Sequence, residues 1–537
     1  MGSGDGKVVG AKKIVDRGPE NEQFTIVLLA DGYTTEEQST FNAHCDEFVK
    51  ALTAFAPYDD CAGHLNFHRI NVESSESGAD DPKTTECSDG TGATVKTYFD
   101  STYCTSQIRR LMSFDAALAT KVLNDEVKTW DRAMVLVNSS AHGGAGGGKI
   151  GITATGPGWT STALHEFGHV MGLADEYPTW FGCPGVKETS YYNHSGVEPD
   201  SPNATTKTKR SEIKWRQLIL PTTKVPTTEN ADCTRCDTQA NPVPAGTVGL
   251  YEGAEYCHCG AYRPSYDCLM RTLGVDHCAV CQAWIRSKIS LGVTAADLAI
   301  TPWGYSQVPR TAPYWQTPDI WGDVETGRAH NDLHIRIRNV GGKASQPFKV
   351  RVTFVPATGV IDSANEILVD EVTRPALASG GTDEFVVNWD LTPPALPAEY
   401  AGYEHFCVIA EIEADECNIG NHRAQNNFVL VGKPPGGSPP PLTLEIANPW
   451  DIQAELTIQL TSHDRRLGLH PVDFDPEGMI LQPGERRPVN VAFDVDESFD
   501  RVRRAEAAFD INHLLNGELL GGVSGKVRAV RPRRGPR

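Results

Sequence analysis

The first part of the chain, to about residue 140, alternates between short apolar runs and amphipathic stretches. Two segments hold consecutive apolar residues, a pattern that predicts strands buried on both faces of a sheet; they are 24–33 and 132–140. Residues 65–74 are predicted to form a further strand between them. Apolar residues at helical spacing predict one helix that Thr34 or Thr35 caps and that runs to about Ala54, and another over roughly 106–127. Strands that alternate with helices indicate an α/β layer with a largely parallel sheet.

Beyond this part the pattern changes twice. Residues from about 180 to 262 are rich in Pro, Thr, Gly and Cys, which predicts a long irregular excursion, and 279–291 then read as a closing helix. Later segments alternate apolar and polar residues, which is typical of antiparallel sandwiches; they are 333–341, 348–355, 384–391 and 406–413. A Pro- and Gly-rich linker precedes a second β-rich region.

These patterns predict three domains. The first is an α/β domain with a twisted, mostly parallel sheet plus helices, and two all-β, immunoglobulin-like sandwich domains follow it. The expected ranges are 8–295 for the α/β domain, 305–432 and 443–530 for the sandwiches, 433–442 for the linker and 531–537 for a basic tail.

Composition narrows the classes of partner. The chain has 49 Lys and Arg against 69 Asp and Glu, a net charge of −20, which argues against nucleic acid as a partner. No run reaches the ~18–20 apolar residues that cross a bilayer, so no transmembrane segment is expected. The sequence does not determine the oligomeric state.

The chemistry is concentrated in the segment TALHEFGHVMGLADEY. His165 and His169 are four residues apart, so on a helix they share one face and can bind one tetrahedral Zn²⁺. Glu166 can reach the remaining position, where it would act as general base on a water molecule. A left-handed turn at Gly172 would bring Asp175 back as the third ligand.

A bare H-E-x-x-H also arises by chance in helices, and the added Gly172 and Asp175 favour a zinc site over that alternative. The carboxylate is the less certain ligand, because Glu176 and Tyr177 follow it directly. A helix-capping or salt-bridge role remains the alternative for either acid.

The sequence resembles the IgA-peptidase family of zinc metalloendopeptidases, in the metzincin clan. The similarity covers about residues 8–292 and is carried by five segments, which are LLADGYTTEE, FHRINVESSESGADDP, ALHEFGHVMGLADEY, YDCLMR and HCAVC. The resemblance implies a metzincin-like fold in which Met270 lies in a tight turn beneath the metal. Met171, inside the motif helix, is expected to pack in the core.

The resemblance also implies a cleft in which substrate lies extended beside an edge strand. The segment 149–156 precedes the motif helix and is the expected edge, so its backbone is a candidate to pair with peptide. The candidate substrate contacts are Ile150, Gly151, Ile152 and Thr153. Tyr266, close to Met270, is a candidate oxyanion donor, and a packed hydroxyl is its alternative.

A glycine-rich stretch resembles a nucleotide loop only in part. Gly143, Gly148 and Lys149 fit G-x-x-x-x-G-K, but Ile150 replaces the required Ser or Thr and a strand follows instead of a helix. We therefore expect no nucleotide site here. The acidic loop 73–81 could hold Ca²⁺, but a solvated loop is favoured.

The number and spacing of the cysteines indicate the cellular compartment of the protein and its possible metal sites. The chain has 14 cysteines, an even number that suits disulfides, and most lie between Cys183 and Cys281. Seven of them form two C-x-x-C pairs, one C-x-C pair and one single cysteine; they are Cys233, Cys236, Cys257, Cys259, Cys268, Cys278 and Cys281. This set can form a disulfide framework, which is the favoured interpretation. The alternative is a second, structural Zn²⁺ site. Cys407 and Cys417 flank an expected hairpin and could form a further bridge.

The sequence therefore predicts a zinc-dependent endopeptidase with one catalytic Zn²⁺, a protein or glycoprotein substrate, and β domains for positioning or adhesion. Two alternatives remain: an adhesion protein with a non-catalytic metal site, and a zinc amidase acting on a non-peptide or cell-wall amide. An extracellular or cell-surface location is expected, although the N-terminus shows no classical signal peptide; the alternative is cytoplasmic.

Overall fold

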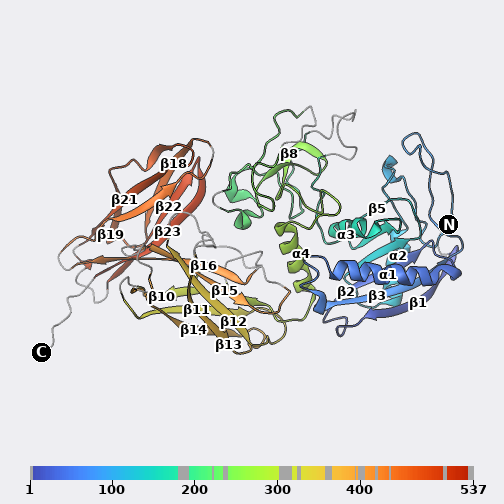
Figure 1. Cartoon of the computed structure of the whole chain (residues 1–537), viewed down its shortest axis with the longest axis horizontal. Helices are drawn as coiled ribbons and strands as arrows, with labels where there is room; N and C mark the ends of the chain where they lie inside the picture. Colours follow the sequence, from blue (N-terminus) through green and yellow to red (C-terminus); the bar gives the residue numbers. More distant parts are fainter. Residues whose placement is uncertain are drawn as a thin grey trace. The chain divides into compact units, whose positions relative to one another are not determined.

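The structure is a computed structural model, and it groups the chain into two compact units (Figure 1). The first comprises 1–207, 226–295 and 416–418, and the second comprises 208–225, 296–415 and 419–537. The residues that the structure describes are 4–178, 193–220, 223–233, 240–300, 317–322, 324, 328–356, 366–393, 395–396, 405–417, 421–434, 437–450, 452–496, 498–499 and 505–529. The basic tail, Cys183 and Cys236 lie outside them. The described chain is mostly β-sheet with few helices.

A six-stranded sheet organises the first unit, in the order β1-β3-β2-β4-β6-β5. Its strands are β1 (Gly6–Val15), β2 (Phe24–Asp31), β3 (Leu65–Ser74), β4 (Arg132–Val137), β5 (Gly144–Ala145) and β6 (Ile150–Ala154). The four inner strands run parallel, and β1 and β5 pair antiparallel at the two edges. Every residue of β2 is buried, as its consecutive apolar residues Val27, Leu28 and Leu29 predict.

Among the residues described in this unit, four α-helices accompany the sheet; they are α1 (Gln38–Thr53), α2 (Ala116–Glu126), α3 (Trp159–Val170) and α4 (Ala279–Gly292). The helix predicted from 106 begins ten residues later, at Ala116. Asp115 caps it by accepting a hydrogen bond from the Leu118 N–H at 2.9 Å, and Ser106 and Gln107 have φ values of +53° and +64° that a helix cannot include. A short hairpin, β7 (Tyr251–Ala254) and β8 (Cys257–Arg263), lies within the irregular region.

Short 3₁₀ turns complete the helical elements; they are η1 (Thr35–Glu37), η2 (Ala62–His64), η3 (Thr105–Gln107), η5 (Arg210–Glu212) and η6 (Arg216–Leu218). The first of these precedes α1, where the Thr34 N–H donates a hydrogen bond to Glu37 at 3.0 Å. The side chain of Glu37 therefore fixes the start of this helical segment.

The second unit consists of sandwich-like sheets. Its strands are β9 (Leu298–Ala299), β10 (Ile320–Gly322), β11 (Asn331–Asn339), β12 (Phe348–Pro356), β13 (Ile367–Arg374), β14 (Thr382–Trp389), β15 (His405–Glu413), β16 (Arg423–Lys433), β17 (Leu442–Ala447), β18 (Ala454–Ser462), β19 (Leu467–Val472), β20 (Glu477–Leu481), β21 (Arg486–Val495), β22 (Glu506–Leu515) and β23 (Glu518–Ala529). An eight-stranded sheet has the order β13-β12-β15-β16-β23-β22-β18-β20, and smaller sheets of four and three strands accompany it.

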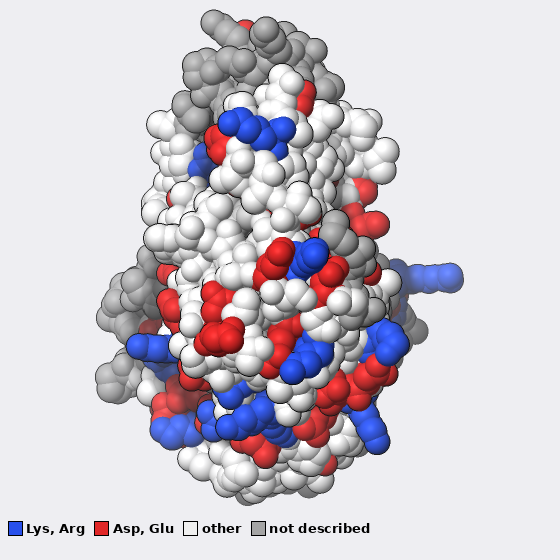
Figure 2. All heavy atoms as spheres, turned by 90° about the vertical axis from the view of Figure 1, so that its right-hand side faces the viewer, with Lys and Arg blue, Asp and Glu red and all other residues white. Residues whose placement is uncertain are grey.

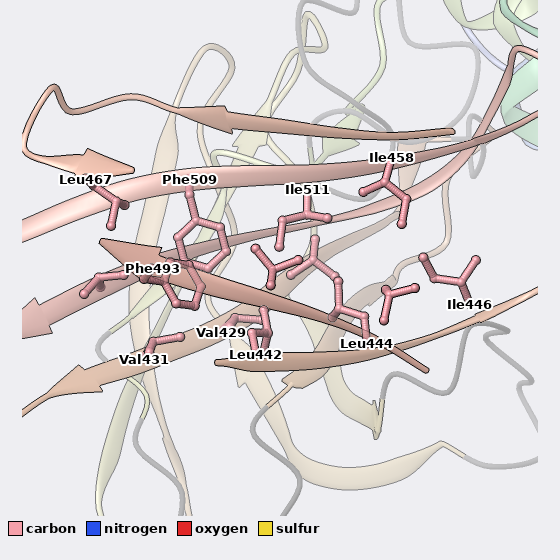
Figure 3. Packing of buried hydrophobic residues seen from close by; sticks show 14 of the residues in the cluster. Val429, Val431, Leu442, Leu444, Ile446, Ile458, Leu467, Phe493, Phe509 and Ile511 are labelled. Carbon is pink, nitrogen blue, oxygen red and sulfur yellow. The ribbon is translucent and has the colours of Figure 1, made fainter. Parts of the chain in front are cut away.

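Two hydrophobic cores fill this unit. One surrounds Trp389, with Phe354 tilted and Phe406 edge-on against its ring. The other surrounds Phe493 and Phe509, whose ring centroids are 4.9 Å apart (Figure 3). Strand β16 contributes to both, and it pairs in parallel with β23. The two β regions expected as separate sandwiches thus have separate cores but share one sheet within one unit.

Three disulfides occur among the described cysteines, and they pair Cys61 with Cys417, Cys87 with Cys104, and Cys233 with Cys259. The predicted bridge between Cys407 and Cys417 is wrong. Cys407 lies inside β15, where its sulfur contacts Asn427 at 2.7 Å, and Cys417 is bonded to the distant Cys61. The favoured framework around Met270 is also wrong for Cys257, Cys268, Cys278 and Cys281, which are free and buried.

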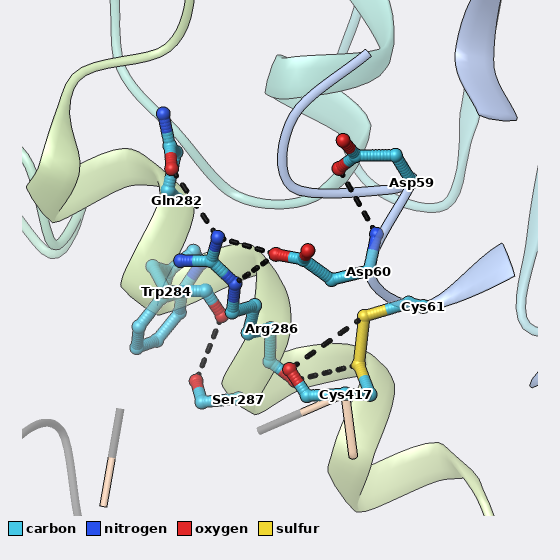
Figure 4. The surroundings of a disulfide bond; sticks show 8 residues. All are labelled: Asp59, Asp60, Cys61, Gln282, Trp284, Arg286, Ser287 and Cys417. Carbon is cyan, nitrogen blue, oxygen red and sulfur yellow. Dashed lines mark hydrogen bonds and ion pairs between the residues drawn. A yellow bond between two sulfur atoms is a disulfide. The ribbon is translucent and has the colours of Figure 1, made fainter. Parts of the chain in front are cut away.

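The Cys61–Cys417 disulfide spans 356 residues of sequence, and it fixes a segment between β15 and β16 to the first unit (Figure 4). The Cys417 sulfur lies 3.9 Å from the Arg286 carbonyl oxygen, and the Arg286 guanidinium pairs with Asp60 at 2.5 Å. Closing so long a loop restricts the unfolded chain, so this bond stabilises the fold mainly through the unfolded state.

Charge is mixed on the face of the molecule drawn in Figure 2. Acidic and basic side chains interleave over the lower part of that face, and a broad uncharged area lies above them. Within the described residues, no helix is both long and apolar enough to cross a bilayer.

Candidate metal centre

The motif histidines lie on α3, which follows β6 after a short turn. His165 Nε2, His169 Nε2 and Asp175 Oδ1 form a triangle in which each pair of atoms is 3.2 Å apart. The helical spacing of four residues brings the two imidazoles together. Gly172 has a φ of +93°, which confirms the predicted left-handed turn, and this turn returns the chain to Asp175.

Backbone carbonyls orient both imidazoles. His165 Nδ1 lies 2.9 Å from the Leu269 carbonyl oxygen, and His169 Nδ1 lies 2.9 Å from that of Leu173. A carbonyl oxygen only accepts hydrogen bonds, so each Nδ1 carries the proton and each Nε2 keeps a free lone pair. Both lone pairs are therefore available to a metal beside Asp175.

The triangle fits a tetrahedral metal. Bonds of about 2.0–2.1 Å to zinc place neighbouring donor atoms about 3.3–3.4 Å apart, close to the separations found here. Asp175 Oδ1 is buried and accepts no hydrogen bond within the described residues. An oxygen of this kind needs a cation or a donor, so His165, His169 and Asp175 suit a Zn²⁺ ion.

The ionisation of the donors also suits a cation. Burial works against a charged imidazole, but the negative charges of Asp175 and Glu166 outweigh it and raise the pKa of His169 to about 9. The same negative charges favour a metal cation, which would replace the second proton on Nε2. Burial likewise works against a charged Asp175, yet the two histidines lower its pKa below the usual range. The carboxylate therefore stays ionised beside the two rings.

Glu166 lies on the same helix, and burial raises its pKa above the usual range. It lies against β5, since a Cβ atom added at Gly144 would be 2.8 Å from Glu166 Oε1. A glycine at this position leaves the Glu166 carboxylate room beside the sheet edge.

The predicted edge strand is wrong. Ile152 and Thr153 of β6 pair with β4 on one side and with Ala145 and Gly144 of β5 on the other. The two-residue β5 is therefore the edge strand beside Glu166, and Ile150 and Gly151 pair only with β4. Among the candidate contacts, Ile152 and Thr153 therefore have no free edge, whereas Ile150 and Gly151 pair on one side only.

A tyrosine other than the predicted one reaches the candidate ligands. The Tyr256 hydroxyl donates a hydrogen bond to Asp175 Oδ2, which leaves Oδ1 facing the histidines. Tyr266 instead lies against the guanidinium of Arg271, 5.1 Å from its ring centroid, and against Tyr251. The proposal of Tyr266 as oxyanion donor therefore receives no support from its position.

Met270 lies beneath the histidine helix, as the resemblance implies. A Cβ atom added at Gly168, between the two histidines, would be 2.5 Å from Met270 Sδ. Met171 is also buried, at the end of α3. The glycine in H-E-F-G-H thus allows the methionine to approach the helix.

Gly168→Ala is expected to push Met270 away from α3 and to destabilise the protein by about 1–3 kcal/mol, as overpacking does in cores. Urea unfolding compared with wild type measures this loss. Gly147→Ala is the matched control, because a Cβ atom there meets nothing within 4 Å. Equal stability of the two variants would contradict the proposed packing.

Two other sequence motifs have ordinary structural roles. The Lys149 ammonium lies over the Trp130 ring, 5.7 Å from its centroid, and a strand follows it, so the glycine-rich stretch gives no helix N-terminus for phosphate. In the acidic loop, the Val95 N–H donates to Asp80, and Arg109 pairs with Asp81 at 2.9 Å. Protein donors already occupy these carboxylates, which disfavours Ca²⁺.

Comparisons with known proteins bear on both parts of the chain. No curated protein matches it. Solved structures that resemble part of it include the CARDB domain of a Pyrococcus furiosus protein, at 17% identity over 25% of this chain and 85% of that one, with a TM-score of 0.16. The α-2-macroglobulin of Escherichia coli is 13% identical, and the similarity covers 41% of this chain and 22% of that one. The β-glucosidase 3B of Thermotoga neapolitana is also 13% identical, and the similarity covers 26% of this chain and 18% of that one. Both have a TM-score of 0.16. Scores this low carry no argument about function.

The family match is more extensive. The model of the family described as IgA Peptidase M64 matches residues 13–241 and 234–289, which together make up slightly more than half of the 537 residues. This match confirms the resemblance predicted from the sequence motifs. The matched region includes the triangle of His165, His169 and Asp175, and the chain belongs to the IgA Peptidase M64 family of peptidases.

Proposed function

We propose that this peptidase is a zinc-dependent endopeptidase of the metzincin type. The observation that carries the proposal is the triangle of His165 Nε2, His169 Nε2 and Asp175 Oδ1 with Glu166 beside it on the same helix. Bound Zn²⁺ would supply Lewis acidity, which lowers the pKa of water and polarises a carbonyl oxygen.

The protein's own residues supply the proton transfers and the positioning. Glu166 would take a proton from the attacking water and later give it to the leaving amine. Its raised pKa suits both steps, because a carboxylate with a pKa nearer neutrality holds that proton more readily. Tyr256 would hold Asp175 in place through its hydrogen bond to Oδ2.

We propose that an extended substrate lies near the end of β5, beside Glu166, where its carbonyl group would be close to the catalytic residues. The peptide would not pair with Gly144, because the Gly144 N–H donates to the Arg110 carbonyl at 3.0 Å and the Gly144 carbonyl accepts from the Met112 N–H at 3.3 Å. We also propose an oxidising, extracellular compartment, and the three disulfides support it.

The experiment that tests this function is cleavage profiling on a peptide library, read by mass spectrometry. A zinc endopeptidase is expected to cut internal peptide bonds, with the Glu166→Gln variant as the blank. Cleavage only of terminal residues or only of non-peptide amides would contradict the proposal, and in the second case would favour the amidase alternative. No cleavage of any substrate in the zinc-loaded enzyme would favour the binding-protein alternative.

A further inference from the structure

A second group of side chains that could hold a metal ion begins one residue after Asp175. Its members come from three segments, and we name the group the sulfur cluster; it consists of Glu176, Cys268, Cys278 and Cys281. One donor atom from each lies within 4.8 Å of every other, and all four residues are buried. The cluster shares no residue with the triangle of His165, His169 and Asp175.

The spacing of the sulfur atoms fits a metal better than a disulfide. Cys268 Sγ and Cys281 Sγ are 3.8 Å apart, whereas a disulfide needs about 2.0 Å. A tetrahedral zinc site with bonds of about 2.3 Å to sulfur places two sulfurs about 3.8 Å apart. The Glu176 Oε1 atom lies 3.2 Å from Cys281 Sγ and completes a set of three sulfurs and one oxygen.

The Glu176 carboxylate gives independent support. The residue is fully buried, and its Oε2 atom has no hydrogen-bond partner among the described residues. Asn203 donates to Oε1 at 2.9 Å, while Arg263 donates to the backbone carbonyls of Glu252 and Gly253. A buried carboxylate with an unsatisfied oxygen is costly unless it takes up a proton or a cation lies beside it.

The backbone around the cysteines favours thiolates. Cys278 is the N-cap residue of α4 and Cys281 lies in its first turn, where the positive end of the helix dipole stabilises negative charge. The Cys278 N–H donates to Cys268 Sγ at 3.3 Å, a contact that strengthens when the sulfur is ionised.

We propose that the sulfur cluster binds a structural zinc ion. Such an ion would join the loop after α3, the Met270 turn and the start of α4. The Glu176 N–H donates to the Met270 carbonyl at 2.9 Å, and the neighbouring Leu269 carbonyl orients His165. The ion thus holds in place the turn that supports the candidate catalytic histidines. This inference is independent of the proposed endopeptidase function.

Zinc content and zinc X-ray absorption of the full-length protein test the proposal. The wild type is expected to hold about two zinc ions per chain, one for each group of donors, with a sulfur shell at about 2.3 Å in the absorption spectrum. Cys278→Ser combined with Cys281→Ser should remove one zinc equivalent and most of the sulfur shell. Cys45→Ser is the matched control, since Cys45 is another buried free cysteine in the first unit.

A second variant separates the two sites. His165→Ala with His169→Ala should keep the sulfur shell and lose only nitrogen and oxygen scattering. Wild-type zinc with no sulfur ligands would overturn the proposal, as would a disulfide between any two of the three cluster cysteines in peptide mapping. The absorption spectrum and the peptide mapping are both made on the wild type. They therefore test whether the sulfur cluster binds zinc even if the cysteine variant fails to fold.

Discussion

Glu166→Gln is expected to lower peptide cleavage by at least about a hundredfold, because a positioned general base contributes typically ~10²–10⁴-fold to the rate. The amide keeps the shape of the side chain but cannot accept a proton. The loss should fall mainly on kcat, since the substrate contacts proposed at β5 are unchanged. Turnover on a fluorogenic peptide at saturating substrate measures it.

Zinc content is the control for this variant. Glu166 belongs to neither group of donors, so the variant should hold as much zinc as the wild type. Turnover equal to the wild type would show that Glu166 is not the base. Lost zinc together with lost turnover would show that Glu166 supports the metal instead.

His165→Ala combined with His169→Ala should abolish both the zinc of the triangle and the peptide cleavage. One carboxylate cannot fix a metal that three donors hold, so one zinc equivalent should be lost relative to the wild type. Elemental analysis after dialysis measures the loss. His463→Ala with His470→Ala is the comparison pair, because both histidines lie in the second unit and in neither group of donors. Full zinc and full turnover in the His165/His169 variant would place the active metal elsewhere.

The parts of the site that depend on local spacing were predictable. Two histidines four residues apart lie on the same face of any α-helix, so their proximity follows from the helix alone. The positive φ of Gly172 is sufficient to turn the chain toward Asp175. Other motif residues act in the scaffold. Asp31 of LLADGY is buried and accepts hydrogen bonds from the Phe99 and Ser101 N–H groups, and therefore fixes the 97–101 loop.

The parts that depend on distant segments were not predictable. Tyr256 reaches Asp175 from the β7–β8 turn, where it has a φ of +64° and its N–H bonds to the Tyr177 carbonyl at 3.0 Å. No local pattern marks such a residue. The edge strand β5 has two residues, too few to show an alternation of apolar and polar positions.

The pairing of distant cysteines and of distant strands escaped prediction for the same reason. Sequence spacing cannot reveal that Cys61 meets Cys417 across 356 residues, or that Cys268 approaches a C-x-x-C pair without bonding to it. The parallel pairing of β16 with β23 joins strands on either side of the Pro- and Gly-rich linker. Local hydrophobic patterns show that strands exist but not which strands pair.

Metal removal and restoration tests the central claim most directly. The measurement is the rate of internal peptide-bond cleavage by the wild type before chelation, after chelation and dialysis, and after zinc is added back. We expect cleavage to disappear with the zinc held by His165, His169 and Asp175 and to return when zinc is restored. Cleavage that continues at the original rate in the metal-free protein would contradict the account.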